Sequence, residues 1–217
     1  NNLENIQKKC LNNNDLRHSY KANSNLSKGF LEDYVFLIDA SLNLYSASLN
    51  TEHLDLANSL NTHTMARFND EVSGMYRYNE NKDLIAQIIK TNDGVIPSPN
   101  AIMAQNLLRL GHINYNKTYI EKAKSMVSSM IPMITPNASS YAKWNSVLLN
   151  TTYTYYEIAV VGSNAKKLSK ELHSKYIPNT LVVGSTEKSS LALFEGRFVS
   201  DGTYIYVCRD NSCKLPV

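Results

Sequence analysis

Apolar residues recur at helical spacing through most of the chain before Glu157. Between Phe30 and Leu49 they cover most of the circumference of a helix, which predicts a helix buried on more than one side. From Glu52 to Phe68 the apolar stripe is narrower, which predicts an outer helix with one solvated face. Because only a short turn separates the two segments, we expect them to be antiparallel neighbours.

The rest of this region predicts four further helices. Ser98 can cap one of them, and Pro99 suits its first turn. Each of the other three begins where a polar segment is followed by apolar residues at helical spacing. The predicted helices run over residues 3–20, from Pro99 to Gly111, from Thr118 to Ile134, and from Ser139 or Ser140 to Tyr155.

After residue 156 the pattern changes to short apolar runs around one polar helix. Two runs, at residues 157–162 and 180–184, predict buried strands, and the helix between them makes a β-α-β unit with parallel strands. A further strand is predicted from Tyr204 to Cys208. Because no Pro/Gly-rich linker separates the regions, we predict two packed parts: helical hairpins over residues 1–156 and a small α/β tail over residues 157–217.

The predicted helix order places three helix starts at one end of the molecule. Helices joined by short turns alternate in direction, so those starting near Leu31, Pro99 and Ser140 run parallel. Helix amino termini present free N–H groups and a positive dipole end. This end could therefore hold a polyhydroxylated or anionic ligand. The polar residues gathered there are Glu32, Asp33, Asp93, Asn100 and Asn137.

Each of these residues also has an ordinary structural interpretation. Glu32 and Asp33 are common first-turn acids that complement the helix dipole. They point about 100° apart, so both cannot face one ligand. Asp93 with the following glycine is typical of a turn, Ser98 is explained as a cap, and Tyr34 is typical of a core.

Composition excludes some partners and leaves the small-molecule hypothesis open. The net charge is +3, from 22 basic and 19 acidic residues that are scattered along the chain, so neither nucleic acid nor a membrane surface is expected as a partner. No run of about 18 apolar residues predicts a membrane-spanning helix. The chain begins without an initiator methionine or a signal-peptide core, so we expect a fragment or a processed chain.

The cysteines and histidines suggest no metal site or cofactor. Cys10 is remote from Cys208 and Cys213, which have four residues between them. A local disulfide between the last two is one interpretation, but two ordinary thiols in a cytoplasmic protein is the one we favour. The five histidines show no metal-ligand spacing.

Three segments, in this order, resemble the carboxy-terminal region of the thioredoxin-domain-containing, spermatogenesis-associated protein 20-like family. Members of that family typically read G-F-L-E-D-Y-A, D-G-A-I-P-S-G-N and Y-V-C-R-N-x-x-C. Pro99 stands where the family usually has glycine, which removes a backbone N–H. The matching segments here are Gly29 to Tyr34, Asp93 to Asn100 and Tyr206 to Pro216.

The resemblance implies a longer protein with a thioredoxin-like domain followed by an (α/α)₆ toroid. Such a toroid is similar to N-acylglucosamine 2-epimerases and six-hairpin glycosidases. This chain would supply its last few hairpins and the α/β tail. We therefore expect a mainly α fold that forms part of a toroid and that pairs with the rest of its parent chain or with itself.

Our leading hypothesis is a module that binds or processes a sugar-like small molecule. Asp33 and Asp93 are the predicted acid/base pair, and Glu32, Tyr34, Ser98 and Asn100 are predicted to shape the pocket. A rival hypothesis is a non-catalytic helical scaffold in which the same residues cap helices. A third gives Cys208 and Cys213 a redox role. The first two differ in whether Asp33 and Asp93 face an open funnel or bind backbone amides.

Overall fold

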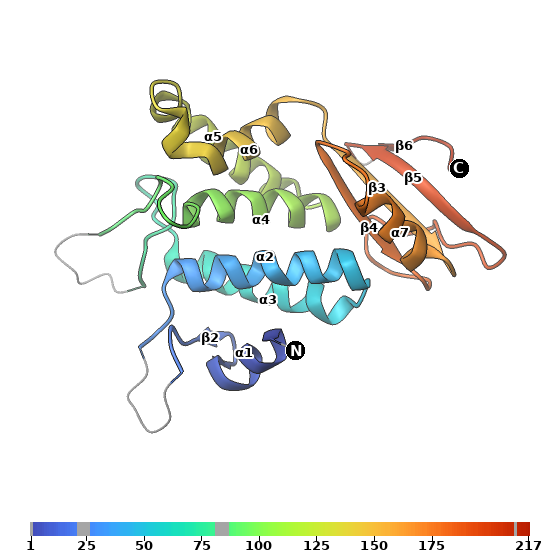
Figure 1. Ribbon diagram of the computed structural model, residues 1–217, viewed down its shortest axis with the longest axis horizontal. Coiled ribbons are helices and arrows are strands. Elements are labelled where there is room, and N and C mark those ends of the chain that lie inside the picture. Colours follow the sequence, from blue (N-terminus) through green and yellow to red (C-terminus); the bar gives the residue numbers. More distant parts are fainter. Residues whose placement is uncertain (1, 21–26, 81–86, 211) are drawn as a thin grey trace.

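The computed structural model describes residues 2–20, 27–80, 87–210 and 212–217. It is mainly α-helical with a small α/β part, as the apolar pattern predicted (Figure 1). The amino-terminal elements are α1 (Asn2–Cys10), β1 (Leu11–Asn12) and β2 (Asp15–Leu16). The helical part comprises α2 (Leu31–Ser48), α3 (Thr51–Phe68), α4 (Pro99–Ile113), α5 (Lys117–Ile134), the 3-10 turn η1 (Ala138–Tyr141) and α6 (Ala142–Thr152). The tail comprises β3 (Tyr156–Gly162), α7 (Ala165–His173), β4 (Thr180–Ser185), β5 (Thr203–Arg209) and β6 (Ser212–Cys213).

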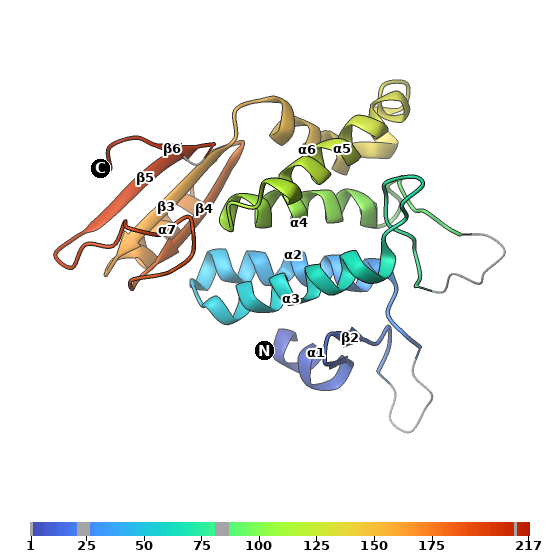
Figure 2. The same ribbon diagram turned by 180° about the vertical axis from the view of Figure 1, so that it is seen from behind.

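The helices alternate in direction and form two layers. α2, α4 and α6 run the same way, and α3 and α5 return between them (Figures 1 and 2). α2 packs on both α3 and α4, α4 packs on α5, and α6 packs on α4 and α5. The three helices therefore run parallel, as expected, although the connection between α3 and α4 spans residues 69–98.

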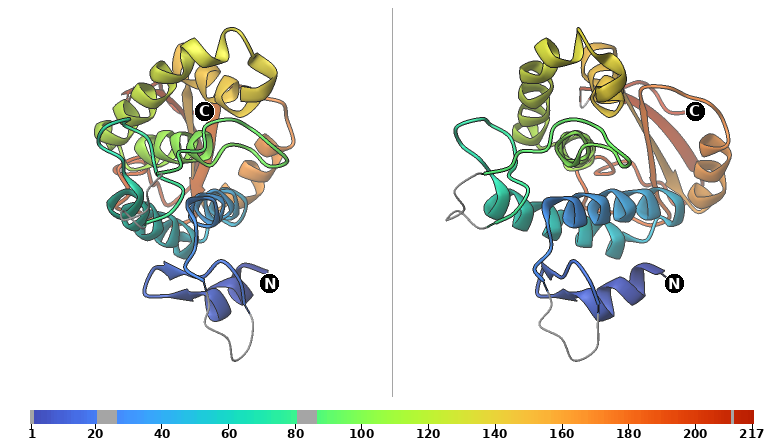
Figure 3. Two further views of the ribbon diagram at one scale, coloured as in Figure 1. Left: turned by 90° about the vertical axis from the view of Figure 1, so that its left-hand side faces the viewer. Right: turned by 60° about the vertical axis from the view of Figure 1, so that its left-hand side comes forward.

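α4 is the central helix of the fold. The right-hand view of Figure 3 looks along its axis and shows other elements on every side. Gln105 and Arg109 are its only residues that are not buried. Its start follows the predicted local chemistry, because the Ser98 hydroxyl accepts a hydrogen bond from the Ala101 N–H at 3.3 Å and Pro99 occupies the first turn.

The tail is a four-stranded sheet with the order β4-β3-β5-β6. β3 and β4 are parallel with α7 between them in sequence, which confirms the predicted β-α-β unit. β5 pairs antiparallel with β3. α7 and β4 both pack on α2, so the sheet closes the end of the helical layers at which α2 and α4 finish (Figure 1).

The favoured interpretation of Cys208 and Cys213 as two ordinary thiols is wrong. They are joined by a disulfide with an S–S distance of 2.03 Å. The physical reason is the strand register, because β5 turns directly into β6 and sets the two cysteines opposite each other. Cys10 is a free, half-buried thiol.

The predicted helix over residues 3–20 is wrong beyond Cys10. The chain turns into the short β1–β2 hairpin, with Asn13 and Asn14 at φ values of 48° and 70°. Asparagine tolerates this left-handed conformation better than most residues, so the local turn outweighs the apolar spacing. None of the described helices is both long and apolar enough to cross a bilayer.

Candidate functional site

Residues 90–93 connect the starts of α2, α4 and α6. The Lys90 ammonium lies 3.4 Å from the carboxylate of Glu32 in the first turn of α2. The Lys90 carbonyl accepts a hydrogen bond of 2.9 Å from the Asn100 side chain in the first turn of α4. The backbone N–H of Asp93 donates to the Ser140 carbonyl, just before α6, at 2.8 Å. The three helix starts therefore meet through one loop.

At this end, Asp33 caps α2. Its Oδ2 accepts a hydrogen bond from the Phe30 backbone N–H at 2.8 Å. The same oxygen lies 2.9 Å from Nδ1 of His18, which follows β2 by two residues. Both contacts are structural, since one satisfies a helix-start amide and the other ties the amino-terminal hairpin to α2.

Asp93 bridges two helix starts. Its Oδ1 accepts from the backbone N–H of Ser98, at the cap of α4, and its Oδ2 accepts from the backbone N–H of Lys143, in the first turn of α6; both distances are 2.8 Å. Each oxygen is thus engaged with an amide that no helical carbonyl can reach. Asp33 and Asp93 lie at the same end of the molecule, and both bind backbone amides.

The four residues predicted to shape a pocket differ in exposure. Glu32 is partly exposed and accepts from the Tyr78 hydroxyl at 2.8 Å as well as from Lys90. Tyr34, Ser98 and Asn100 are buried.

The buried three are committed to neighbouring backbone. The Tyr34 hydroxyl accepts from the Leu16 N–H at 2.8 Å. The Asn100 amide exchanges hydrogen bonds with the N–H and the carbonyl of Tyr76, at 2.8 and 3.0 Å. The Tyr34 contact ties β2 to α2, and the Asn100 contacts fix the loop before α4.

A polar network on the aligned helices was missed at the sequence level. Oδ1 of Asp39, on α2, accepts from Arg109 Nη1 at 2.9 Å and from Gln105 Nε2 at 3.0 Å. Its Oδ2 accepts from Asn43 at 3.3 Å. The Lys143 ammonium, on α6, donates to Gln105 Oε1 at 2.5 Å. Side chains from all three parallel helices therefore hold one another in place.

Lys143 joins this network to the helix starts, because its backbone N–H binds Asp93 while its side chain binds Gln105. Burial lowers the pKa of the Lys143 ammonium and outweighs the opposing attraction of Asp39 and Asp93. The network thus contains a lysine that loses its proton more readily than a solvated lysine does.

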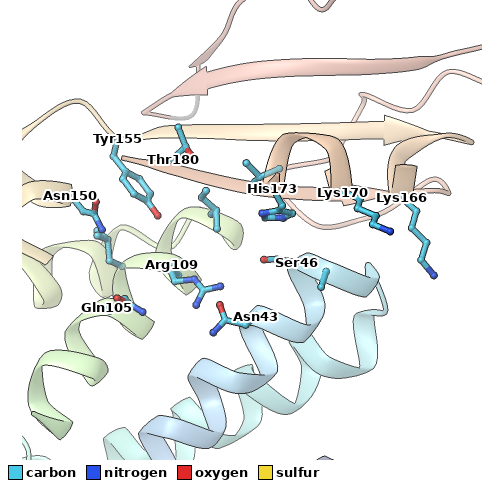
Figure 4. A pocket seen from close by; sticks show the side chains of 14 residues that line it. Asn43, Ser46, Gln105, Arg109, Asn150, Tyr155, Lys166, Lys170, His173 and Thr180 are labelled. Atoms are coloured by element: carbon cyan, nitrogen blue, oxygen red, sulfur yellow. The ribbon is translucent and has the colours of Figure 1, made fainter. Parts of the chain in front are cut away.

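A cavity of about 720 Å³ lies between this network and the tail. Figure 4 shows Asn43 and Arg109, from different helices, with their polar ends toward each other on its helical side. α7 and β4 form the facing wall with Lys166, Lys170 and Thr180 among others. Within the described part of the chain, no carboxylate lines this cavity.

One sequence signal could have revealed the network. Gln105 and Arg109 lie one helical turn apart on a largely apolar helix, so they mark one polar stripe. The described residues contain no group of three or more His, Cys, Asp or Glu side chains placed to hold a metal ion.

Comparison with known proteins identifies relatives of this chain. It is similar to spermatogenesis-associated protein 20 of Homo sapiens and of Rattus norvegicus, each 29% identical over 203 residues. The match covers 87% of this chain and 26% of each relative, so the chain spans about a quarter of their length. An uncharacterized protein of Caenorhabditis elegans is 27% identical over 205 residues, which is 88% of this chain and 27% of that protein. No family model matches the chain.

Proposed function

We propose that this chain, a relative of spermatogenesis-associated protein 20, binds a hydroxylated, negatively charged small molecule of the sugar-acid or sugar-phosphate class. The ligand would occupy the cavity between α2, α4 and the tail. The observation that carries the proposal is that the only two partly exposed residues of α4, Gln105 and Arg109, both line this cavity and are both held by Asp39.

The charges of the cavity favour an anion. Lys166 and Lys170 line it together with Arg109, and Asp39, which pairs with Arg109, is not itself among the described lining residues. Asp39 orients the Arg109 guanidinium, and an oriented guanidinium suits the planar oxygens of a carboxylate or phosphate. A mobile surface lysine alone would not provide that geometry.

The remaining lining residues suit a sugar ring. The amides of Asn43 and Asn150 and the hydroxyl of Thr180 can exchange hydrogen bonds with ligand hydroxyls. Leu108 and the Tyr155 ring supply apolar surface for the C–H face of the ring. A few fixed polar groups on a partly apolar wall are typical of small-molecule sites.

We also propose that the helical part belongs to a larger toroid in the longer protein. Its support is the alternation of α2, α4 and α6 with the returning helices α3 and α5. Carbohydrate processing by the whole protein, with Asp33 and Asp93 as the acid/base pair, remains a proposal from the resemblance. A thioredoxin-like domain elsewhere in that protein is likewise a proposal from the resemblance.

A second candidate function is a non-catalytic helical scaffold. It is favoured by one specific observation, which is that the Asp33 and Asp93 carboxylates bind backbone amides at helix starts. In this function the same residues stabilise the loops, and the cavity serves binding alone.

Isothermal titration calorimetry of the chain with glucuronate and with glucose 6-phosphate tests the proposal, with glucose as the uncharged control. Lys170→Glu reverses a charge on the cavity wall, and Lys8→Glu makes the same change on α1, outside it. For charges about 7 Å apart in water, reversal costs about 1 kcal/mol, or roughly fivefold in affinity. We expect this loss for Lys170→Glu alone. Equal effects of both variants, or no binding of either anion, would refute the proposal.

A further inference from the structure

A second cavity, of about 410 Å³, lies beside the first. The two share Leu108, Asn150 and Tyr155 as lining residues. The second cavity is also lined by the end of α4, the start of α5, residues 151–154 at the end of α6 and the turn at Arg209 and Asp210. It therefore opens at the junction between the helical part and the sheet.

A buried histidine–carboxylate pair lies at this junction. Nδ1 of His112, near the end of α4, is 2.5 Å from Oε1 of Glu157 on β3. Glu157 is completely buried, and its Oε2 has no hydrogen-bond partner in the described part of the chain. The Tyr155 ring packs against the imidazole with the ring centroids 4.7 Å apart. The Tyr155 ring therefore restricts the orientation of the imidazole plane, and the contact with Glu157 holds one of its nitrogens.

The second nitrogen of His112 is left free. In the tautomer that donates from Nδ1 to Glu157, Nε2 carries the lone pair. Nε2 has no hydrogen-bond partner among the described residues. It is also absent from the fully buried polar atoms that lack a partner, so it is not completely shielded from solvent. Since His112 lines the second cavity, the lone pair is accessible from that cavity.

A purely structural role does not explain this arrangement. A buried histidine–carboxylate pair contributes little net stability compared with apolar side chains of similar size, because both polar groups lose their hydration. Stability also gives no reason for one edge of the imidazole to reach a cavity. A carboxylate that orients an imidazole with a free nitrogen is instead the arrangement that a general base requires.

The charges around this cavity restrict the ligand. Lys124 is paired with Glu121 at 3.2 Å, and Arg209 with Asp210 at 3.3 Å. Lys117 is the one lysine or arginine among the described lining residues without an ion pair. The hydroxyls of three threonines, at residues 151, 152 and 154, also line the wall. These groups suit a hydroxyl-rich ligand with at most one negative charge.

We propose that His112 and Glu157 form a base dyad that acts on a hydroxylated, singly negative ligand in the second cavity. His112 Nε2 accepts the proton of a ligand hydroxyl or of a water molecule, and Glu157 stabilises the imidazolium that forms. The dyad is separate from the Asp39 network and does not depend on ligand binding in the first cavity.

Site-resolved modification with diethyl pyrocarbonate tests the dyad, because this reagent acylates the free nitrogen of a neutral imidazole. The intact chain is treated between pH 5.5 and 8, and the modification of each histidine is followed by peptide mass spectrometry. His112 is only 6% exposed, whereas His173 is exposed. We nevertheless expect His112 to react at least as fast as His173. A His112 that stays unmodified while His173 reacts would overturn the proposal without any variant.

Two further comparisons identify the roles of Glu157 and of the ligand. Glu157→Gln should slow the limiting high-pH reaction of His112 about tenfold and leave His173 unchanged, since a hydrogen bond to a charged partner is roughly twice as strong as a neutral one. Circular dichroism shows that the variant remains folded. Gluconate should protect His112, and acetate, which lacks hydroxyls, should not. An unchanged rate in a folded Glu157→Gln chain, or equal protection by both anions, contradicts the dyad.

Discussion

Replacing Asp93 distinguishes helix capping from catalysis at the predicted acid/base pair. Its two oxygens each accept a backbone hydrogen bond of 2.8 Å, from Ser98 at the start of α4 and from Lys143 at the start of α6. Removing the side chain leaves two partly buried amides without a partner. Asp93→Ala is therefore expected to loosen both helix starts at once.

The size of the effect follows from these two contacts. Hydrogen bonds to a charged group contribute about 1.5–3 kcal/mol each, so Asp93→Ala should lower the free energy of unfolding by about 3–6 kcal/mol. Asp93→Asn keeps one acceptor oxygen and should cost about 2 kcal/mol. For a chain of this size the melting temperature falls about 2–4 °C per kcal/mol, which gives roughly 6–12 °C or more for Asp93→Ala.

Thermal unfolding followed by circular dichroism measures this directly. Asp201→Asn is the control, because Asp201 is exposed and accepts no hydrogen bond from the described residues. If Asp93 acts only as an acid or base, Asp93→Asn should melt with the wild-type chain. A melting temperature within about 1 °C of wild type would refute the capping role.

Three other predictions follow from the packing, the charges and the cysteines. Gly111→Ala should destabilise the chain by about 1–3 kcal/mol in urea unfolding, because a Cβ on α4 would lie 2.6 Å from a side-chain carbon of α5; an unchanged midpoint would contradict that close approach. Burial alone would raise the pKa of Glu80, but Lys28 and Arg67 outweigh it and hold this pKa below its ordinary value of 4.5. The stability from this cluster is therefore present at neutral pH and lost as the pH falls below 4.5, and Glu80→Gln should reduce that acid loss; equal acid loss in both chains would contradict the assignment. A thiol titration of the native chain should detect one free thiol, that of Cys10, and a count of three would contradict the disulfide.

Much of the fold could be predicted because its signals are local. The Ser98–Pro99 start of α4 and the short apolar strands of the tail depend on neighbouring residues, and the structure contains them where expected. The turn at Asn13 and Asn14 was also local, but the apolar spacing of the preceding residues continued past it and concealed it.

The cavities depend on contacts between distant segments, and the disulfide depends on how one local turn sets a strand register. From the sequence alone, Gln105 and Arg109 would be interpreted as a solvated stripe. In the structure, they line a cavity whose other wall is formed by the tail. Glu157 reads as an ordinary strand residue until His112 is found 2.5 Å away. The Cys208–Cys213 bond depends on the β5–β6 register. None of these positions can be deduced from periodicity, which describes one element at a time.

The most direct test of the central claim is an NMR titration of the isotope-labelled chain with glucuronate. The account predicts that the shifting signals belong to Asn43, Gln105, Arg109 and Lys170, and that glucose causes much smaller shifts. Signals that move only around Asp33 and Asp93, or no movement at any of these positions, would contradict it.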